Sequence, residues 1–86
     1  MAKSPSFEAV CAQVVKRLQA ERERRGLSKY ALGQKSGVSQ SMLGLVERGL
    51  RNPTLETLLK IAAALEVDLG EIVSAASRDV ARSRKR

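Results

Sequence analysis

The chain has 86 residues, of which 43% are hydrophobic and only 2% aromatic. A chain of this length forms one domain with a modest core of aliphatic side chains and is too short for two domains. Lys and Arg number 16 against 9 acidic residues, which gives a net charge of +7. This excess favours a polyanionic partner, although ordinary solubility charge produces the same composition.

Several classes of function lack the residues that they need. The sequence has no histidine and one cysteine, so a metal site and a disulfide within the chain are excluded. It also has no phosphate-binding loop, and general acid–base and nucleophilic catalysis lack their usual residues. We therefore expect no enzyme activity, no metal and no cofactor. Cys11 lies among Val10, Val14 and Val15, which favours a buried side chain over a redox sensor.

Membrane and export signals are also absent from the sequence. No run of about 18 apolar residues occurs, and the N-terminus lacks the apolar segment of a signal peptide. We expect a soluble, cytoplasmic protein with no membrane partner.

The N-terminal part predicts a flexible arm followed by a long helix. Residues 1–6 are polar and contain a proline, whereas apolar residues recur at helical spacing from Phe7 onward. A charged stretch then leads to Gly26, where we expect the helix to end. Phe7 and Val10 carry an apolar stripe at the start of this helix, which could cover the bundle or meet a second subunit.

Residues 28–48 read as two short helices joined by a tight turn. Ser28 and Ser39 each stand where a serine oxygen can accept from the free N–H groups of a first helical turn. Gly37 falls where the first helix must end in a left-handed conformation. One apolar face turns inward from both helices, formed by Leu32, Val38, Leu43 and Val46. This pattern predicts a helix-turn-helix, whose second helix suits the major groove of DNA.

Two more helices are expected after the helix-turn-helix. Thr54 is a candidate N-cap for the first of them, and its inward face is expected to consist of Leu55, Leu58, Leu59, Ala62 and Leu65, with Ile61 partly sharing it. The last helix carries Leu69, Ile72 and Val73. Val80 continues this stripe, so the helix could run into the basic tail at residues 78–86.

Four segments in order resemble the phage-repressor/Cro-like (XRE) DNA-binding domain. They are residues 25–28 (RGLS), 37–39 (GVS), 47–49 (ERG) and 52–65 (NPTLETLLKIAAAL). The resemblance covers roughly residues 14–73. It implies an all-α fold, namely a compact five-helix lambda-repressor-like bundle within residues 7–77. It also implies a homodimer that binds palindromic operators, in a protein of bacterial or phage type that is associated with the nucleoid.

The resemblance also assigns residues to the DNA. Base reading is expected from the start of the second short helix, at Gln40, Ser41, Gly44 and Leu45. A glutamine amide can make two hydrogen bonds to adenine, and a leucine offers an apolar surface to a thymine methyl. A merely solvated Gln40 and an apolar strip that binds protein are the alternatives. Phosphate contacts are expected from Lys29, Tyr30, Arg48, Arg51 and Asn52.

Two further sets of residues are implied to hold the assembly together. Arg22 of the first helix is expected to pair with Glu47 and fix the recognition helix against the bundle. The dimer interface is expected at the last helix, from Leu69, Ile72, Val73 and Val80.

Together these features predict a sequence-specific DNA-binding transcription regulator, either a repressor or a small controller protein. The alternative is an antitoxin-type protein that binds a partner toxin and regulates its own operon, in which case a protein partner exists besides DNA.

Overall fold

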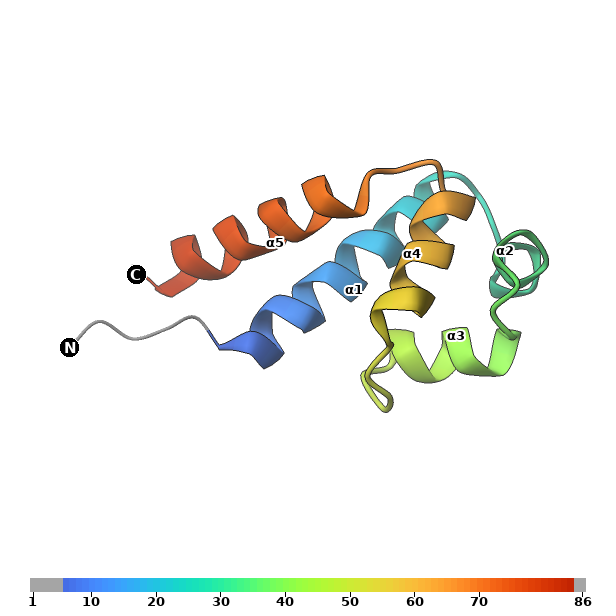
Figure 1. Cartoon of the computed structure of the whole chain (residues 1–86), viewed down its shortest axis with the longest axis horizontal. Coiled ribbons are helices and arrows are strands. Elements are labelled where there is room, and N and C mark those ends of the chain that lie inside the picture. Colours follow the sequence, from blue (N-terminus) through green and yellow to red (C-terminus); the bar gives the residue numbers. More distant parts are fainter. Residues whose placement is uncertain (1–5, 85–86) are drawn as a thin grey trace.

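The computed structural model describes residues 6–84, which form five α-helices and no strand (Figure 1). The helices are α1 (Phe7–Arg24), α2 (Lys29–Ser36), α3 (Gln40–Glu47), α4 (Leu55–Ala64) and α5 (Leu69–Arg84). The predicted all-α, five-helix bundle is confirmed. Within this part of the chain, no helix is long and apolar enough to cross a membrane.

Polar caps define where the helices begin. The hydroxyls of Ser28 and Ser39 accept from the N–H groups of Ala31 and Met42, at 3.0 and 3.1 Å. Thr54 caps α4 in the same way. Because each cap satisfies an N–H group that has no partner inside the helix, the chain must enter each helix at that residue. All three predicted caps are confirmed.

The turn between α2 and α3 depends on two glycines. Gly37 has a φ of 79°, the left-handed conformation predicted for it. Gly33, one turn earlier, leaves room for the backbone that follows α2, because a Cβ there would lie 2.8 Å from the Val38 carbonyl oxygen. Any residue with a Cβ at position 33 would therefore force the backbone of this tight turn to shift.

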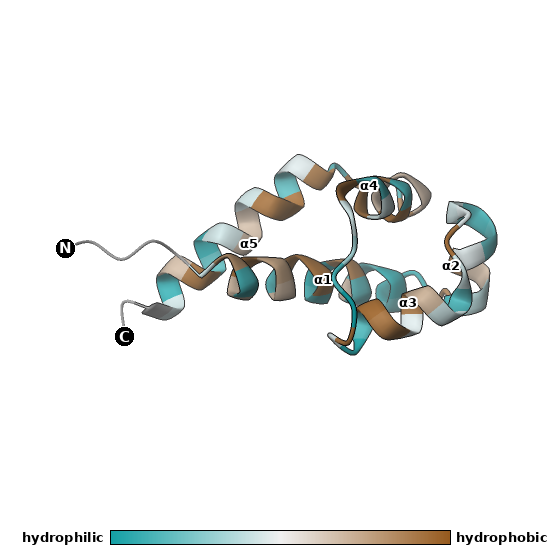
Figure 2. Cartoon of the chain, turned by 60° about the horizontal axis from the view of Figure 1, so that its bottom comes forward, coloured by the Kyte–Doolittle hydropathy of each residue, from teal (hydrophilic) through white to brown (hydrophobic). Residues whose placement is uncertain are grey.

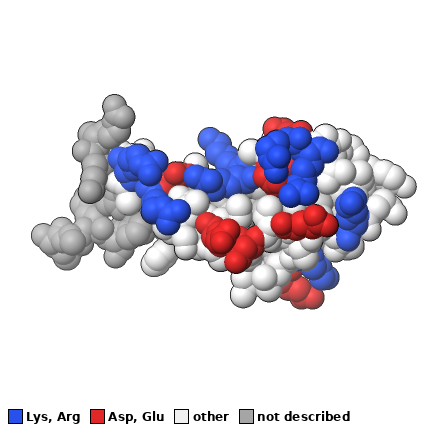
Figure 3. All heavy atoms as spheres, turned by 90° about the horizontal axis from the view of Figure 1, so that it is seen from above, with Lys and Arg blue, Asp and Glu red and all other residues white. Residues whose placement is uncertain are grey.

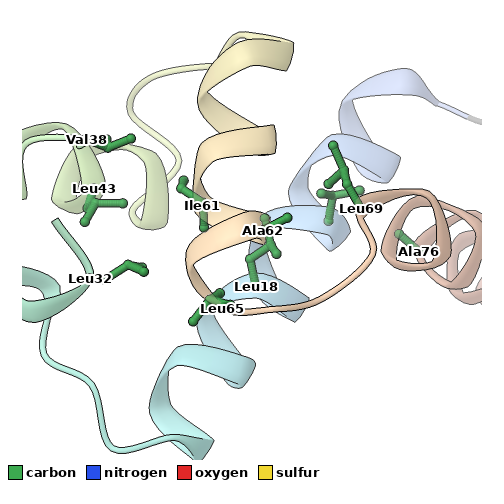
Figure 4. Close-up of a cluster of buried hydrophobic side chains, with 10 residues drawn as sticks. Leu18, Leu32, Val38, Leu43, Ile61, Ala62, Leu65, Leu69 and Ala76 are labelled. Atoms are coloured by element: carbon green, nitrogen blue, oxygen red, sulfur yellow. The ribbon is translucent and has the colours of Figure 1, made fainter. Parts of the chain in front are cut away.

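The core lies between all five helices, with Leu69 and Ala76 contributed by α5 (Figure 4). Leu32, Leu43 and Leu65 are its largest fully buried side chains. The four residues predicted to form the inner face of the helix-turn-helix are all buried. This common core fixes α3 relative to the rest of the bundle.

The prediction for the inner face of α4 was partly wrong. Ile61, Ala62 and Leu65 are buried, but Leu55 is 67% exposed and Leu59 is 50% exposed. Leu59 lies about 100° around the helix from Leu58, at the edge of the buried face. Leu55 is the first residue of α4, which begins directly after the loop that follows α3 (Figure 1), and the core does not cover it there.

Helix α5 packs along α1 in the opposite direction, so the start of α1 and the end of α5 lie on the same side of the molecule (Figure 1). Apolar and polar residues alternate along both helices (Figure 2). The Arg17 guanidinium pairs with Asp79 at 2.6 Å, and the Gln13 amide donates to the same carboxylate. Most of the predicted basic tail therefore belongs to a helix that is held against α1. The other tail residues, 85–86, and residues 1–5 of the predicted arm lie outside the described residues.

The start of α1 differs from prediction at Cys11. The thiol is exposed, so the buried position predicted for it was wrong. Val10 and Val14 turn toward the core, and the next residue along a helix points about 100° away from its neighbour. Phe7 is 79% exposed and leaves the apolar stripe at the start of α1 incompletely covered.

Candidate nucleic-acid interface

A hollow of about 540 Å³ opens between α1, α2 and α3. We call it the recognition hollow. Lys29 and Arg48 contribute cationic side chains to it, and Glu47 contributes a carboxylate. The remaining lining residues are Gln19, Gln40, Ser41, Gly44 and Leu45. All four residues predicted to read bases therefore line the same hollow, together with two of those predicted to contact phosphates.

Helix α3 presents this surface because its other face is buried. Leu43 and Val46 are core residues, whereas Gln40 and Ser41 are exposed at the first turn. A Cβ added to Gly44 would meet no atom within 4 Å, so the helix backbone is accessible there. A ligand at this face would find two polar side chains, an open stretch of backbone and the apolar side chain of Leu45.

Arg22 and Glu47 join α1 to the end of α3. Arg22 Nε and Nη2 donate to the two Glu47 oxygens at 2.8 and 3.0 Å, and Nη1 donates to the Leu27 carbonyl at 2.7 Å. Both side chains are only 9% exposed. The hydrogen bonds to Glu47 raise the pKa of Arg22 above its usual value, so the guanidinium is charged at neutral pH.

Lys29 lies close to this pair. Its ammonium nitrogen is 3.9 Å from Glu47 Oε1, and its side chain is 40% exposed. Since Glu47 already accepts two hydrogen bonds from Arg22, Lys29 keeps most of its capacity to attract an anion. Its position at the first residue of α2 also places it beside helical N–H groups that favour negative charge.

The remaining predicted phosphate contacts surround a neighbouring hollow. Arg48 Nε donates to the Gly44 carbonyl at 3.2 Å, which fixes the guanidinium at the end of α3. Arg51 and Asn52 are exposed and line a second hollow of about 420 Å³, which shares Glu47 and Arg48 with the first. Tyr30 is 60% exposed on α2 but does not line either hollow.

Gln19 was missed from the sequence. It lines the recognition hollow from α1, where its amide donates to Glu23 Oε2 at 3.2 Å. The signal available was its position three residues before Arg22, on the same face of the helix. A residue on that face must lie near α3 if Arg22 pairs with Glu47.

The expected dimer surface is changed by the structure. Leu69 is 8% exposed and belongs to the core of its own subunit, so it has little surface left for a partner. Ile72 and Val80 are half-buried, and Ile72 packs against the core. Val73 is 38% exposed and is the most accessible of the four.

Charge is mixed on the side of the molecule away from α3. Figure 3 shows acidic side chains among the basic ones on that face. Elsewhere in the described chain, acidic side chains likewise pair with basic ones, as Glu21 does with Arg25 and Glu56 with Lys60. That face therefore offers no uninterrupted basic surface to a polyanion.

Comparisons with known proteins agree with this geometry. Residues 18–72 match the family model HTH_3, described as a helix-turn-helix. The chain is 46% identical over 55 residues to the HTH-type transcriptional regulator SlrR of Bacillus subtilis, covering 63% of this chain and 36% of SlrR. It is 38% identical over 60 residues to the immunity repressor protein of Bacillus phage phi105, covering 70% of this chain and 42% of the repressor. It thus spans less than half the length of these two relatives.

A solved structure is similar over most of both chains. The restriction-modification controller protein C.AhdI from Aeromonas hydrophila superposes with a TM-score of 0.68 at 36% identity, covering 77% of this chain and 98% of the controller protein. The family match extends from α1 into α5 and includes the whole recognition hollow. The chain belongs to HTH_3, the XRE-type family of helix-turn-helix domains.

Proposed function

We propose that this chain binds a palindromic operator as a homodimer, with α3 in the major groove, and acts as a repressor or small controller protein in the cytoplasm. The observation that carries the proposal is the recognition hollow, which brings Gln40, Ser41 and the open backbone of Gly44 together with the cations Lys29 and Arg48. This arrangement places groups that can read bases beside cations that can contact the phosphates of the same groove.

Each residue of α3 then has a distinct role. Gln40 pairs its amide with adenine N6 and N7, and Ser41 makes a single hydrogen bond to a neighbouring base. Leu45 contacts a thymine methyl, and Gly44 allows the helix to approach closely. Because only two polar side chains reach the bases, DNA shape supplies part of the specificity.

Exposed apolar side chains on α4 and α5 support the homodimer. Val73 of α5 and Leu55 and Leu59 of α4 are the large aliphatic side chains that these two helices leave exposed. A two-fold dimer would cover such residues with the same residues of its partner. It would also repeat the recognition hollow about one DNA turn (~34 Å) away, which is the reason for a palindromic site.

Selection of bound DNA from a random pool tests the proposal, and we expect two inverted half-sites. On the selected operator, Gln40→Ala should cost about 1–3 kcal/mol and relax the preference at one symmetric pair of positions. Gln34→Ala is the matched control, since Gln34 is exposed on α2 and does not line the recognition hollow. If Gln40→Ala weakens the operator and random DNA by the same factor, Gln40 does not read a base.

A further inference from the structure

We propose that α1 adds a DNA-backbone contact beyond the helix-turn-helix, made by Lys16 to phosphates that flank the operator half-site. This inference rests on the proposed function, because it assumes that α3 lies in the major groove. It concerns the second hollow, which we call the flank hollow, and assigns that hollow to the sugar-phosphate backbone.

The flank hollow continues the recognition hollow toward the N-terminal half of α1. The two share Glu47 and Arg48 at the end of α3. One wall of the flank hollow is the loop after α3, with Arg51 and Asn52, and the other is α1, with Lys16. A DNA strand held at Lys29 and Arg48 would therefore meet Arg51 and then Lys16 as it leaves the recognition hollow.

The charges around the flank hollow are available to a ligand. Among the ion pairs of residues 6–83, none involves Lys16, Arg48 or Arg51. By contrast, the arginines on the remaining faces of α1, such as Arg17 and Arg24, are held by carboxylates.

The acidic residues of the flank hollow do not cancel this charge. Glu47 is already paired with Arg22, and Glu8 lies two helical turns before Lys16. Three cations in one trough outnumber the carboxylates that have no ion pair within residues 6–83, and such a trough suits a chain of regularly spaced phosphates. An acidic protein segment is the other polyanion that could occupy the trough, and binding to duplexes of two lengths distinguishes the two ligands.

The two duplexes both carry the selected operator. The short one ends at the outer edges of the half-sites, and the long one extends about 10 base pairs further on each side, roughly one helical turn. Binding is measured between 50 and 200 mM salt for the unmodified chain, Lys16→Gln and Lys35→Gln. Lys35 is the matched control because it has the same charge, lies on α2 and lines neither hollow.

Lys16→Gln should weaken binding to the long duplex. On a plot of the logarithm of the binding constant against the logarithm of the salt concentration, its slope should be shallower by about 0.9 for each phosphate that Lys16 neutralises in the unmodified chain. Over that fourfold change in salt, each such phosphate accounts for a factor of about 3–4 in affinity. The short duplex should not distinguish Lys16→Gln from Lys35→Gln.

Since Cys11 is the only cysteine and lines the flank hollow, the long duplex should also slow its alkylation by a maleimide more than the short one.

The α1 contact would be overturned, and a protein ligand favoured, by two results together. The salt dependence of binding to the long duplex would be the same for Lys16→Gln and Lys35→Gln, and the long duplex would not slow the alkylation of Cys11. Lys29→Gln keeps that failure separate from failure of the proposed function, because it should weaken both duplexes. If Lys29→Gln changes neither, α3 does not bind DNA as proposed, and the α1 contact falls with it.

Discussion

Removing Glu47 tests whether the Arg22–Glu47 pair positions α3 or simply stabilises the fold. In Glu47→Leu, the Arg22 guanidinium stays at a site where its side chain is only 9% exposed, but both of its carboxylate hydrogen bonds are absent. Nη1 keeps the Leu27 carbonyl as an acceptor, and Glu23 lies 3.7 Å from Nη2 but is itself 59% exposed. The charge is therefore left poorly compensated.

The expected cost follows from that burial. Removing one partner of a buried ion pair costs about 3–5 kcal/mol, a large part of the roughly 5–15 kcal/mol by which a domain is stable. The double variant Arg22→Met/Glu47→Leu removes both charges and fills the same space with apolar atoms. It should recover most of that stability, because no charge then has to be desolvated at this site.

Urea unfolding followed by circular dichroism measures the stability of each variant, and titration with the selected operator measures binding. We expect the double variant to be folded but to bind the operator more weakly, because no directional contact then fixes the end of α3 to α1. A cost below about 1 kcal/mol for Glu47→Leu would mean that the pair behaves as an exposed one. A double variant that binds like the unmodified chain would refute the positioning role.

Four other outcomes follow from the structure. Gly33→Val should destabilise the fold by about 1–3 kcal/mol, since its Cβ would meet the Val38 carbonyl. Gly44→Ala should instead raise the stability by up to about 1 kcal/mol and weaken operator binding. Urea unfolding measures the opposite changes in stability of the two variants. Val73→Glu should dissociate the dimer in sedimentation, and Ser74→Glu, also exposed on α5, should not. Hydrogen bonds from Arg17 and Gln13 lower the pKa of Asp79, so Asp79→Asn should lower the Tm at pH 7, with the difference shrinking as the pH falls through about 4 and below.

Local patterns allowed the helix-turn-helix to be predicted closely. The caps Ser28 and Ser39 and the left-handed Gly37 depend only on interactions within a few residues of chain. Such interactions are visible in a sequence because the partner is three residues away. The same holds for Thr54 at the start of α4.

Predictions that required the position of a helix in the bundle were less successful. Helical periodicity assigns residues to a face, but it does not say how far the neighbouring helices extend. Leu55 lies at the end of α4, where no core is present to cover it, and Leu59 and Cys11 lie just outside the buried faces of their helices. Leu69 was expected at an interface, but it fills space beside α1 and α4 in its own subunit.

The surface around α3 shows why a motif alone does not define the interface. Arg22, Gln19 and Lys16 belong to α1, separated from α3 by the whole of α2, and no periodic spacing connects them to Gln40. The Arg22–Glu47 pair is what brings this face of α1 to the recognition hollow. Once that pair is in place, residues one and two turns earlier on α1 must follow the same edge. The positioning role that we expect of this pair would therefore also determine which part of α1 lies closest to the proposed path of the DNA.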